Sequence, residues 1–338
     1  MNIFRRRFGG FFLLAALIGV LFVGAGCWSM TNSSQTAVIV QTPQLITEPT
    51  DGFVPIVSAI QTATQSLDLV IYELHDASVE QALVAASQRK VRVRVLLCAG
   101  SLAEANESAY LYLRSAGVAV QWAPISFTFT HQKTLVVDGR EAFIMTFNLV
   151  TKDEPTGRDF AVVDQNVADL HAIEHVFEAD WDGREIYPSN GTDLVWSPGA
   201  EPALLHVINS ANASIEIYNE EMNDDTITDA LVDAARRGVS VEIVMTDNPA
   251  YHAAFQKLAD AGVGVRLFAP KATLYIHAKL ILVDKACAFL GSQNFSYTSL
   301  YKNRELGLMV TNPSIISSLH QTFQTDWVKA IPFHAMTY

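Results

Sequence analysis

The residues with the clearest chemical potential are two copies of one polar set. In each copy a His is followed two residues later by a Lys, then by an Asp five residues beyond the Lys and an Asn ten residues beyond the Asp. The copies are His131, Lys133, Asp138 and Asn148, and then His277, Lys279, Asp284 and Asn294. Residues i and i+2 of a strand face the same side, so each His and Lys should point together from one strand edge.

These residue types suit the cleavage of a phosphodiester. Ammonium and amide groups can donate hydrogen bonds to the phosphate oxygens, whose negative charge grows during attack, without help from a metal. One neutral His can attack phosphorus and form a covalent phosphohistidine. The other, protonated, can give its proton to the leaving oxygen and then activate water. We therefore expect a site that needs no metal and no other cofactor.

The second copy is the more complete, because it also contains Gly291 and Ser292. It resembles the signature of the phospholipase D superfamily, which is HxK(x)4D(x)6GS with an Asn shortly after. The first copy has Met145-Thr146 where the family has Gly-Ser. Met145 adds bulk, which bears on the substrate fit of the first half more than on the chemistry. The resemblance covers roughly residues 54–330.

The resemblance implies a role for each residue of the site. It makes His131 the nucleophile and His277 the acid and base, with the reverse assignment as the alternative. It also implies that an acid beyond each motif, Asp159 or Glu305, fixes the tautomer of a catalytic His, within its own half or across the halves. Phosphate binding then falls to Lys133, Lys279, Asn148 and Asn294, phosphate support to Thr146 and Ser292, and structural bracing to Asp138, Asp284 and Gly291.

The elements that must position these residues form a tandem repeat. The two polar sets recur at one constant spacing, and four further pairs recur at the same spacing: Arg158 and Arg304, Phe177 and Phe323, Asp180 and Asp326, Trp181 and Trp327. Strand and helix patterns alternate within each unit, which predicts an α/β fold. Each half should be a mixed sheet flanked by helices, and the halves should pack about a pseudo-two-fold axis with both polar sets in one cleft.

The expected elements follow from this alternation. In the first half we predict strands at 67–72, 91–97, 118–122, 134–137 and 142–145. Helices are predicted at 78–89 and 167–181, and a further helix after the strand at 91–97 should end at 116–117. In the second half we predict strands at 214–219, 239–245, 263–268, 280–283 and 288–290, with helices at 227–236 and 314–327. The halves themselves are expected at 53–182 and 200–330, joined by a connector at 183–199 and followed by a tail at 331–338.

The N-terminal segment reads as an export signal. Residues 1–27 contain Arg5–Arg7, then an apolar run, and end in Gly24-Ala25-Gly26-Cys27. Small residues before one Cys resemble the bacterial lipoprotein cleavage site, so we expect lipidation at Cys27. The alternatives are an uncleaved anchor helix and an ordinary signal peptide. Residues 28–52 are rich in Ser, Thr, Gln and Pro and should form a tether. The protein should therefore be exported and membrane-anchored, or secreted.

The composition and net charge disfavour some classes of function. The 338 residues are 50% hydrophobic and carry a formal net charge of −12, which disfavours binding of long nucleic acid. We expect a monomeric phospholipase D-type enzyme that hydrolyses glycerophospholipids or transfers their phosphatidyl group. The alternatives are a cardiolipin synthase-type phosphatidyltransferase, an endonuclease of the same family, and a phosphate- or lipid-binding protein without activity.

Several weaker signals remain open at this stage. Glu73 and Glu221 end equivalent strands and either rim the cleft or are solvated. The segment His171–His175 matches a zinc-protease pattern, but a buried stripe on the same helix would leave both imidazoles on the wet face. Cys98 and Cys287 either form a disulfide or remain thiols.

Overall fold

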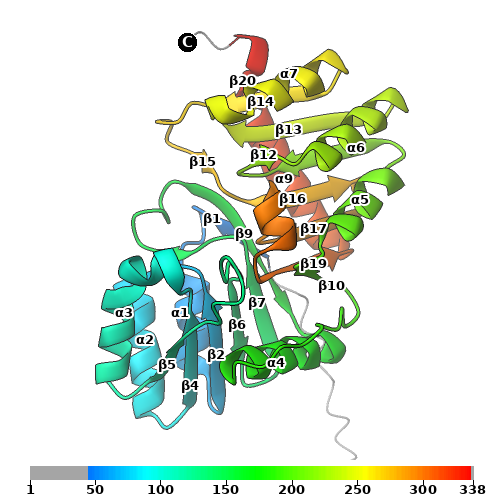
Figure 1. The fold of residues 1–338 in the computed structure, drawn as a ribbon. Helices are drawn as coiled ribbons and strands as arrows, with labels where there is room; N and C mark the ends of the chain where they lie inside the picture. Colours follow the sequence, from blue (N-terminus) through cyan, green and yellow to red (C-terminus); the bar gives the residue numbers. More distant parts are fainter. Residues whose placement is uncertain (1–44, 336–338) are drawn as a thin grey trace, which may run out of the picture. The chain divides into compact units, whose positions relative to one another are not determined.

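The computed structural model describes residues 45–335, and the fold in this part consists of two halves of the same design. Each half contributes a large mixed sheet (Figure 1). The predicted α/β class and its two repeats are confirmed. The predicted leader, with Cys27, lies outside the described residues. None of the described helices is both long and apolar enough to cross a bilayer.

The first sheet has the strand order β1-β9-β7-β6-β2-β4-β5. Strands β2, β4 and β5 pair in parallel, and the remaining neighbours pair antiparallel. A strand from the second half, β15 (Tyr275–Ile276), adds to it by pairing in parallel with β9. The bounds are β1 Leu45–Glu48, β2 Ser66–Ile71, β4 Arg92–Leu97, β5 Ala119–Trp122, β6 Thr134–Val137, β7 Glu141–Met145 and β9 Gly157–Asp164.

The second sheet has the order β10-β19-β17-β16-β11-β13-β14-β20 and repeats this pattern. Its bounds are β10 Leu194–Ser197, β11 Ser214–Tyr218, β13 Ser240–Thr246, β14 Gly264–Phe268, β16 Lys279–Val283, β17 Cys287–Gly291, β19 Glu305–Val310 and β20 Ile331–Pro332. Two short parallel pairs stand apart from the sheets: β3 (Leu74–His75) with β8 (Leu149–Val150), and β12 (Met222–Asn223) with β18 (Phe295–Ser296).

The helices cover the sheets in equivalent ways. In the first half they are α1 Val54–Thr62, α2 Ala77–Gln88, α3 Ala103–Ser115 and α4 Val167–Trp181. In the second half they are α5 Glu201–Ser210, α6 Asp225–Arg236, α7 His252–Asp260, α8 Tyr297–Tyr301 and α9 Pro313–Lys329. The repeat extends to the caps. Asp76 accepts a hydrogen bond from the N–H of Val79 at the start of α2, and Asp224 does so from Ile227 at the start of α6.

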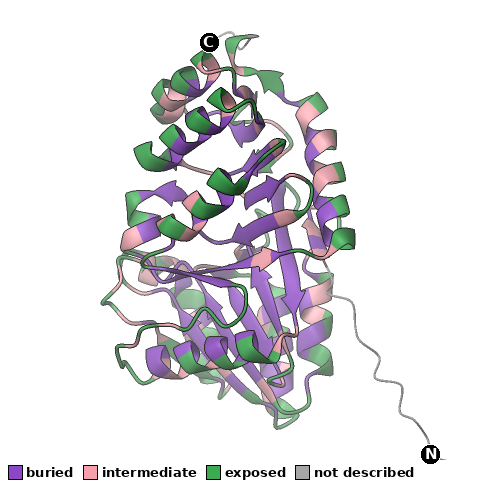
Figure 2. Cartoon of the chain, turned by 90° about the vertical axis from the view of Figure 1, so that its right-hand side faces the viewer, coloured by how far each residue is buried: buried purple, intermediate pink, exposed green. Residues whose placement is uncertain are grey.

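The buried apolar residues of the described chain form three large clusters and a small fourth one between the first sheet and α4. One cluster lies between the first sheet and helices α1 to α3, and a second lies between the second sheet and α5 to α7. A third cluster joins the two halves, with Ile144 and Phe160 of the first sheet packed with Tyr218 and Leu280 of the second and with residues of α4 and α9. Figure 2 shows buried strands between helices whose outer faces are exposed. The halves therefore share a continuous apolar interface.

Three segments outside the predicted halves turn out to be strands. β1 lies within the expected tether and pairs with β9, β10 lies within the expected connector and pairs with β19, and β20 lies within the expected tail and pairs with β14. The Ser, Thr and Pro content of residues 28–52 predicts a tether. Leu45–Glu48 nevertheless forms an edge strand, and its residues alternate between half-buried and buried. Cys98 and Cys287 are both thiols, not a disulfide.

Candidate active site

The two motif histidines, His131 and His277, are each held by the other half of the molecule. The backbone N–H groups of His131 and Gln132 both donate to the carbonyl oxygen of Arg304, at 2.9 and 3.0 Å. In the same way, the N–H groups of His277 and Ala278 donate to the carbonyl oxygen of Arg158, at 3.3 and 2.9 Å. These reciprocal contacts bring the start of β6 and the start of β16 to the same place.

The acids are exchanged between the halves as well. His131 Nδ1 lies 2.9 Å from Glu305 Oε2, and His277 Nδ1 lies 3.0 Å from Asp159 Oδ1. Sequence alone left open whether each acid serves its own half, and the structure shows that both pairs cross. A carboxylate at Nδ1 places the second ring nitrogen, Nε2, toward a reacting partner. Neighbouring groups hold the acids in turn, since Ser299 and Asn303 donate to Glu305 Oε1 at 2.6 and 2.9 Å.

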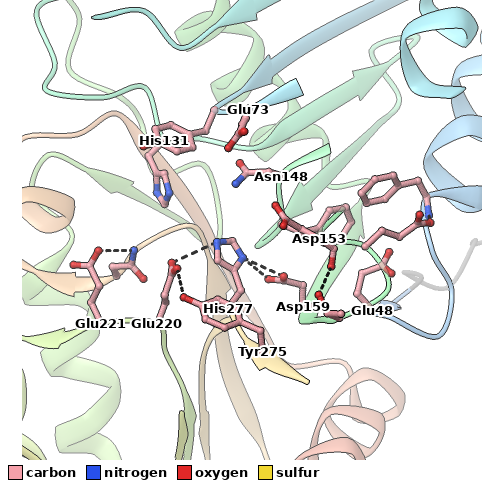
Figure 3. A pocket seen from close by; sticks show the side chains of 17 residues that line it. Glu48, Glu73, His131, Asn148, Asp153, Asp159, Glu220, Glu221, Tyr275 and His277 are labelled. Carbon is pink, nitrogen blue, oxygen red and sulfur yellow. Dashed lines mark hydrogen bonds and ion pairs between the residues drawn. The ribbon is translucent and has the colours of Figure 1, made fainter. Parts of the chain in front are cut away.

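Both histidines line one cavity with a volume of about 400 Å³ (Figure 3). Asn148 and Asn294 line it too, and the side-chain oxygen of each is buried without a hydrogen-bond partner. Buried polar atoms normally have partners, so these two oxygens are suited to accept a hydrogen bond from a ligand hydroxyl, whereas only the amide N–H groups could donate to a phosphate. The structure thus brings together the His and Asn residues that the sequence predicted to meet.

The two lysines lie behind the histidines. Lys133 Nζ donates to the carbonyl oxygen of His131 at 2.8 Å, and Lys279 Nζ donates to that of His277. Both side chains are almost fully buried and neither lines the cavity. Burial and the charge of Lys279 lower the pKa of Lys133 to about 7. In this structure both ammonium groups lie behind the cavity wall on backbone carbonyls, and their contact with phosphate stays a prediction.

A carboxylate missed by the sequence analysis contacts the second His. Glu220 Oε2 lies 3.4 Å from His277 Nε2 and accepts a hydrogen bond from Lys279 at 3.0 Å, and Tyr275 donates to its other oxygen at 2.9 Å. Burial alone would raise the pKa of Glu220, but the charges of Lys279 and His277 outweigh burial, and the pKa lies well below its usual range. The only sequence signal for it was a mismatch between the repeats, because the equivalent residue of the first half is Tyr72.

This mismatch makes the two histidines chemically different. His277 has a carboxylate at each ring nitrogen, and it can donate to both only as the imidazolium. His131 instead packs edge-on against Tyr72, with ring centroids 4.6 Å apart. Burial and the charge of Lys133 lower the pKa of His131 to about 4, against the opposing effect of Glu305. The surroundings of the two imidazoles therefore differ, and His131 is held in its neutral form near pH 7.

The hydroxyl groups of Thr146 and Ser292 form hydrogen bonds within the protein and do not face the cavity. Thr146 and Ser292 are fully buried, and neither lines the cavity. Thr146 Oγ1 donates to Asp159 Oδ1 at 2.5 Å, while Ser292 Oγ accepts from the N–H of Leu306 at 3.2 Å. This placement differs from the expected support of the phosphate. Thr146 instead fixes the acid that holds His277.

The departure from Gly-Ser in the first motif is accommodated in the core. A Cβ at Gly291 would lie 2.4 Å from the Cα of Gly307 on the neighbouring strand, so this position requires Gly. In the first half the equivalent pair is Met145 and Ala161, and Met145 is buried in the core cluster of that half. Its bulk therefore points away from the cavity and leaves the substrate space of the first half open.

The motif aspartates brace the strands, as the resemblance implied. Asp138 accepts hydrogen bonds from the backbone N–H groups of Thr64, Gln65 and Ser66, between 2.7 and 3.1 Å. Asp284 has the equivalent partners, which are the N–H groups of Asn212, Ala213 and Ser214. Although partial burial opposes it, these donors lower the pKa of Asp138 to about 2. Both aspartates are structural and neither lies in the cavity wall.

The cavity wall is rich in carboxyl groups. Glu73 and Glu221 both line it, which settles that they rim the cleft. The full set of lining acids is Glu48, Glu73, Asp153, Glu154, Asp159, Glu220 and Glu221. Within residues 45–335, no cluster of three or more His, Cys, Asp and Glu side chains is arranged to hold a metal ion. On α4, His171 and His175 are exposed and the stripe containing Ile173 is buried, as expected.

Comparison with known proteins now identifies the family. The model described as "Cardiolipin synthase, PLD-like domain" matches the chain twice, over residues 56–181 and 204–327. The chain belongs to the phospholipase D superfamily. Within this superfamily it is 24% identical to a cardiolipin synthase of Halalkalibacterium halodurans, over 84% of this chain and 65% of that protein. It is 27% identical to cardiolipin synthase A of Erwinia tasmaniensis, over 84% of this chain and 68% of that protein.

A solved structure supports the phospholipase D fold. Phosphatidylserine synthase of Haemophilus influenzae superposes with a TM-score of 0.69 at 13% identity, over 87% of this chain and 88% of that chain. At this identity the likeness concerns the fold alone. The chain spans about two thirds of the length of the curated relatives it matches.

Proposed function

We propose that the protein transfers phosphatidyl groups between alcohols through a covalent phosphohistidine. The observation that carries this proposal is that two duplicated histidines line one cavity, each held at Nδ1 by an acid of the other half. The cardiolipin synthase relatives favour transfer to an alcohol over the hydrolysis that the sequence analysis placed first. The substrates are then glycerophospholipids, and the acceptor is an alcohol, such as the glycerol hydroxyl of a second lipid.

The difference between the histidines supports one assignment of roles. Neutral His131 attacks phosphorus with Nε2, and the bond from phosphorus to the headgroup oxygen breaks. The His277 imidazolium gives its proton to that oxygen, so the headgroup leaves as an alcohol. His277, now neutral, then takes the proton of the acceptor hydroxyl, whose oxygen attacks phosphorus and releases His131. Asn148, Asn294 and the two lysine charges stabilise the phosphate oxygens.

Trapping the intermediate tests this assignment. A phosphatidyl ester of p-nitrophenol has a leaving group that needs no proton, so His277→Ala should still complete the first step. We expect about one equivalent of p-nitrophenolate per enzyme in a burst, with the phosphatidyl group found on His131 by mass spectrometry. His131→Ala should give no burst. A label on His277 in the His131→Ala protein would reverse the roles, and no label in either variant would contradict the covalent mechanism.

A product analysis tests transfer against hydrolysis. Phosphatidylglycerol vesicles should yield mainly diphosphatidylglycerol and glycerol, with little phosphatidate, when lipids are resolved by mass spectrometry. Phosphatidate as the main product would restore the hydrolase interpretation. The endonuclease alternative is disfavoured by the carboxyl-rich cavity wall, which repels a polyanion. Cleavage of plasmid DNA with no turnover of vesicles would overturn this ranking.

A further inference from the structure

The cavity contains a buried acid that the proposed chemistry does not use. Glu48 is 1% exposed and lines the cavity, and within residues 45–335 no side chain hydrogen-bonds its carboxyl group, which only the backbone amide of Gly52 approaches. It is the last residue of β1 and is registered opposite Asp159 of β9. Directly opposed residues of an antiparallel pair lie on the same face, so Glu48 stands beside the acid that holds His277.

No cationic side chain pairs with the Glu48 carboxyl in the described part of the chain. Among residues 45–335, no Lys or Arg lines the cavity. The guanidinium of nearby Arg158 donates to the backbone oxygen of Glu48 and to the carboxylate of Asp326, so it does not serve the Glu48 side chain. Burial and the charges of Glu154 and Asp159 raise the pKa of Glu48 to about 8, although the Gly52 amide partly opposes them. A buried carboxyl without a partner is costly, and a bound cation would relieve this cost.

Two aromatic rings and two further acids complete this end of the cavity. Phe53 and Phe147 are stacked with ring centroids 5.7 Å apart, and both line the cavity. Glu154 accepts the backbone N–H of Phe53 at 2.9 Å, and Asp153 lies on the same loop (Figure 3). Carboxylates combined with aromatic faces are the surroundings that bind ammonium groups in proteins. This end of the cavity thus differs from the phosphate end, where the asparagines meet the histidines.

We propose that Glu48, together with Asp153, Glu154, Phe53 and Phe147, binds the ammonium group of an amino-alcohol headgroup, such as ethanolamine or choline. The subsite lies on the side of His277, which protonates the leaving headgroup oxygen. The donor lipid would therefore place its phosphate between the histidines and its cationic nitrogen at Glu48. This inference rests on the proposed function and specifies the class of lipid that the site takes.

Headgroup selectivity of the full chain tests the subsite. In mixed micelles, wild type should show a higher kcat/KM for phosphatidylethanolamine or phosphatidylcholine than for phosphatidylglycerol. Glu48→Gln keeps the shape but cannot form the charged contact, so the ratio of amine to glycerol lipid should fall about tenfold or more. Asp153→Asn, at an exposed loop position, should lower the ratio in the same direction. The matched control, Glu107→Gln on the outer face of α3, should leave the ratio unchanged.

A binding measurement separates failure of the subsite from failure of the proposed function. Calorimetry with glycerophosphoethanolamine and glycerophosphoglycerol requires no turnover. We expect wild type to bind the amine probe more tightly, and Glu48→Gln and Asp153→Asn to lose that preference. Preferential binding without lipid turnover would support the subsite and contradict the transferase proposal. Turnover with equal preference for both lipids, or a preference that neither variant changes, would overturn the subsite.

Discussion

Positions 72 and 220 are equivalent in the two repeats but carry different chemistry. In the first half an aromatic ring packs against His131, and Lys133 Nζ lies 5.1 Å from the same ring. In the second half Glu220 takes that place and contacts both His277 and Lys279. A carboxylate stabilises a neighbouring imidazolium, whereas a ring in a buried site favours the neutral form. One difference in residue type thus gives two otherwise matching imidazoles different neighbours, an aromatic ring for His131 and a second carboxylate for His277.

The pH dependence of kcat/KM should report two of these residues. His131 must be neutral to attack, so activity should fall as the pH drops through about 4. Lys133 must be charged to stabilise the phosphate, so activity should fall again as the pH rises through about 7. We expect a bell-shaped profile between these limits, measured with a soluble phosphodiester at fixed ionic strength. An acid limb near the ordinary His value would contradict the burial of His131 as the cause.

Sequence reasoning at this scale found the repeated residues and missed the unrepeated ones. Comparison of the two halves identified both histidines and both acids because they match. Glu220 corresponds to Tyr72 in the first half, so a comparison that looks for residues shared by the two repeats does not find it. Glu48 has no equivalent motif, and strand pairing with β9, not its neighbours in the chain, places it in the cavity. Which acid serves which His could not be predicted, because the crossing depends on how the halves pack.

Among the elements, β9 and the segment that leads into β19 supply charged contacts between the halves. Adjacent residues of a strand face opposite sides, so Asp159 of β9 reaches His277 while Arg158 reaches α9 of the other half. Arg158 pairs with Asp326 at 2.6 Å, and Arg304 of the second half pairs with Asp180 of α4 at 3.0 Å. The repeated Arg and Asp residues thus lock the halves together through two buried, reciprocal ion pairs.

Removal of one partner of such a pair should be strongly destabilising. Asp180→Asn leaves Arg304 buried with an uncompensated charge, which costs about 3 to 5 kcal/mol of unfolding free energy in buried pairs. The control is Asp233→Asn in the exposed pair with Arg236, where the change should stay below about 1 kcal/mol. Urea unfolding followed by circular dichroism measures both. Equal changes in the two variants would show that the buried pair does not hold the halves together.

The elements were predictable where periodicity was clear. The strand at 134–137 and the helix at 167–181 have the predicted bounds, and most others differ by one or two residues at their ends. The strands β9 and β19 were not predicted. Every residue of β9 is buried, so it lacks the alternation of a half-exposed strand, and its charged residues interrupt the apolar run. The helices α1, α5 and α7 were missed as well.

At the scale of the whole molecule, the net charge of the protein affects how it reaches a lipid substrate in a membrane. The chain carries a net charge of −12, and seven acids line its cavity. An acidic protein has no electrostatic attraction to an anionic membrane, so a tether to the bilayer would supply the proximity that charge does not. We propose on this basis, and on the sequence of residues 1–27, that the protein is exported and lipidated at Cys27.

Metabolic labelling tests the anchor. Labelled palmitate should appear on the wild-type protein expressed in a bacterial host, and Cys27→Ser should abolish the label. Cys98→Ser is the matched control, because Cys98 is buried in the first half and should not be acylated. The fractionation of wild type with membranes should be lost in the Cys27→Ser protein. An unlabelled wild-type protein would contradict the proposed lipidation.

The exchange of acids between the halves has a consequence for how this catalytic centre can change over evolutionary time. Two identical subunits related by a dyad would carry every substitution twice, so their paired imidazoles would always have the same neighbours. Because both halves here belong to one polypeptide, a single codon can alter one side and spare the other. The covalent joining of the repeats is thus what permits a division of labour between acid and nucleophile.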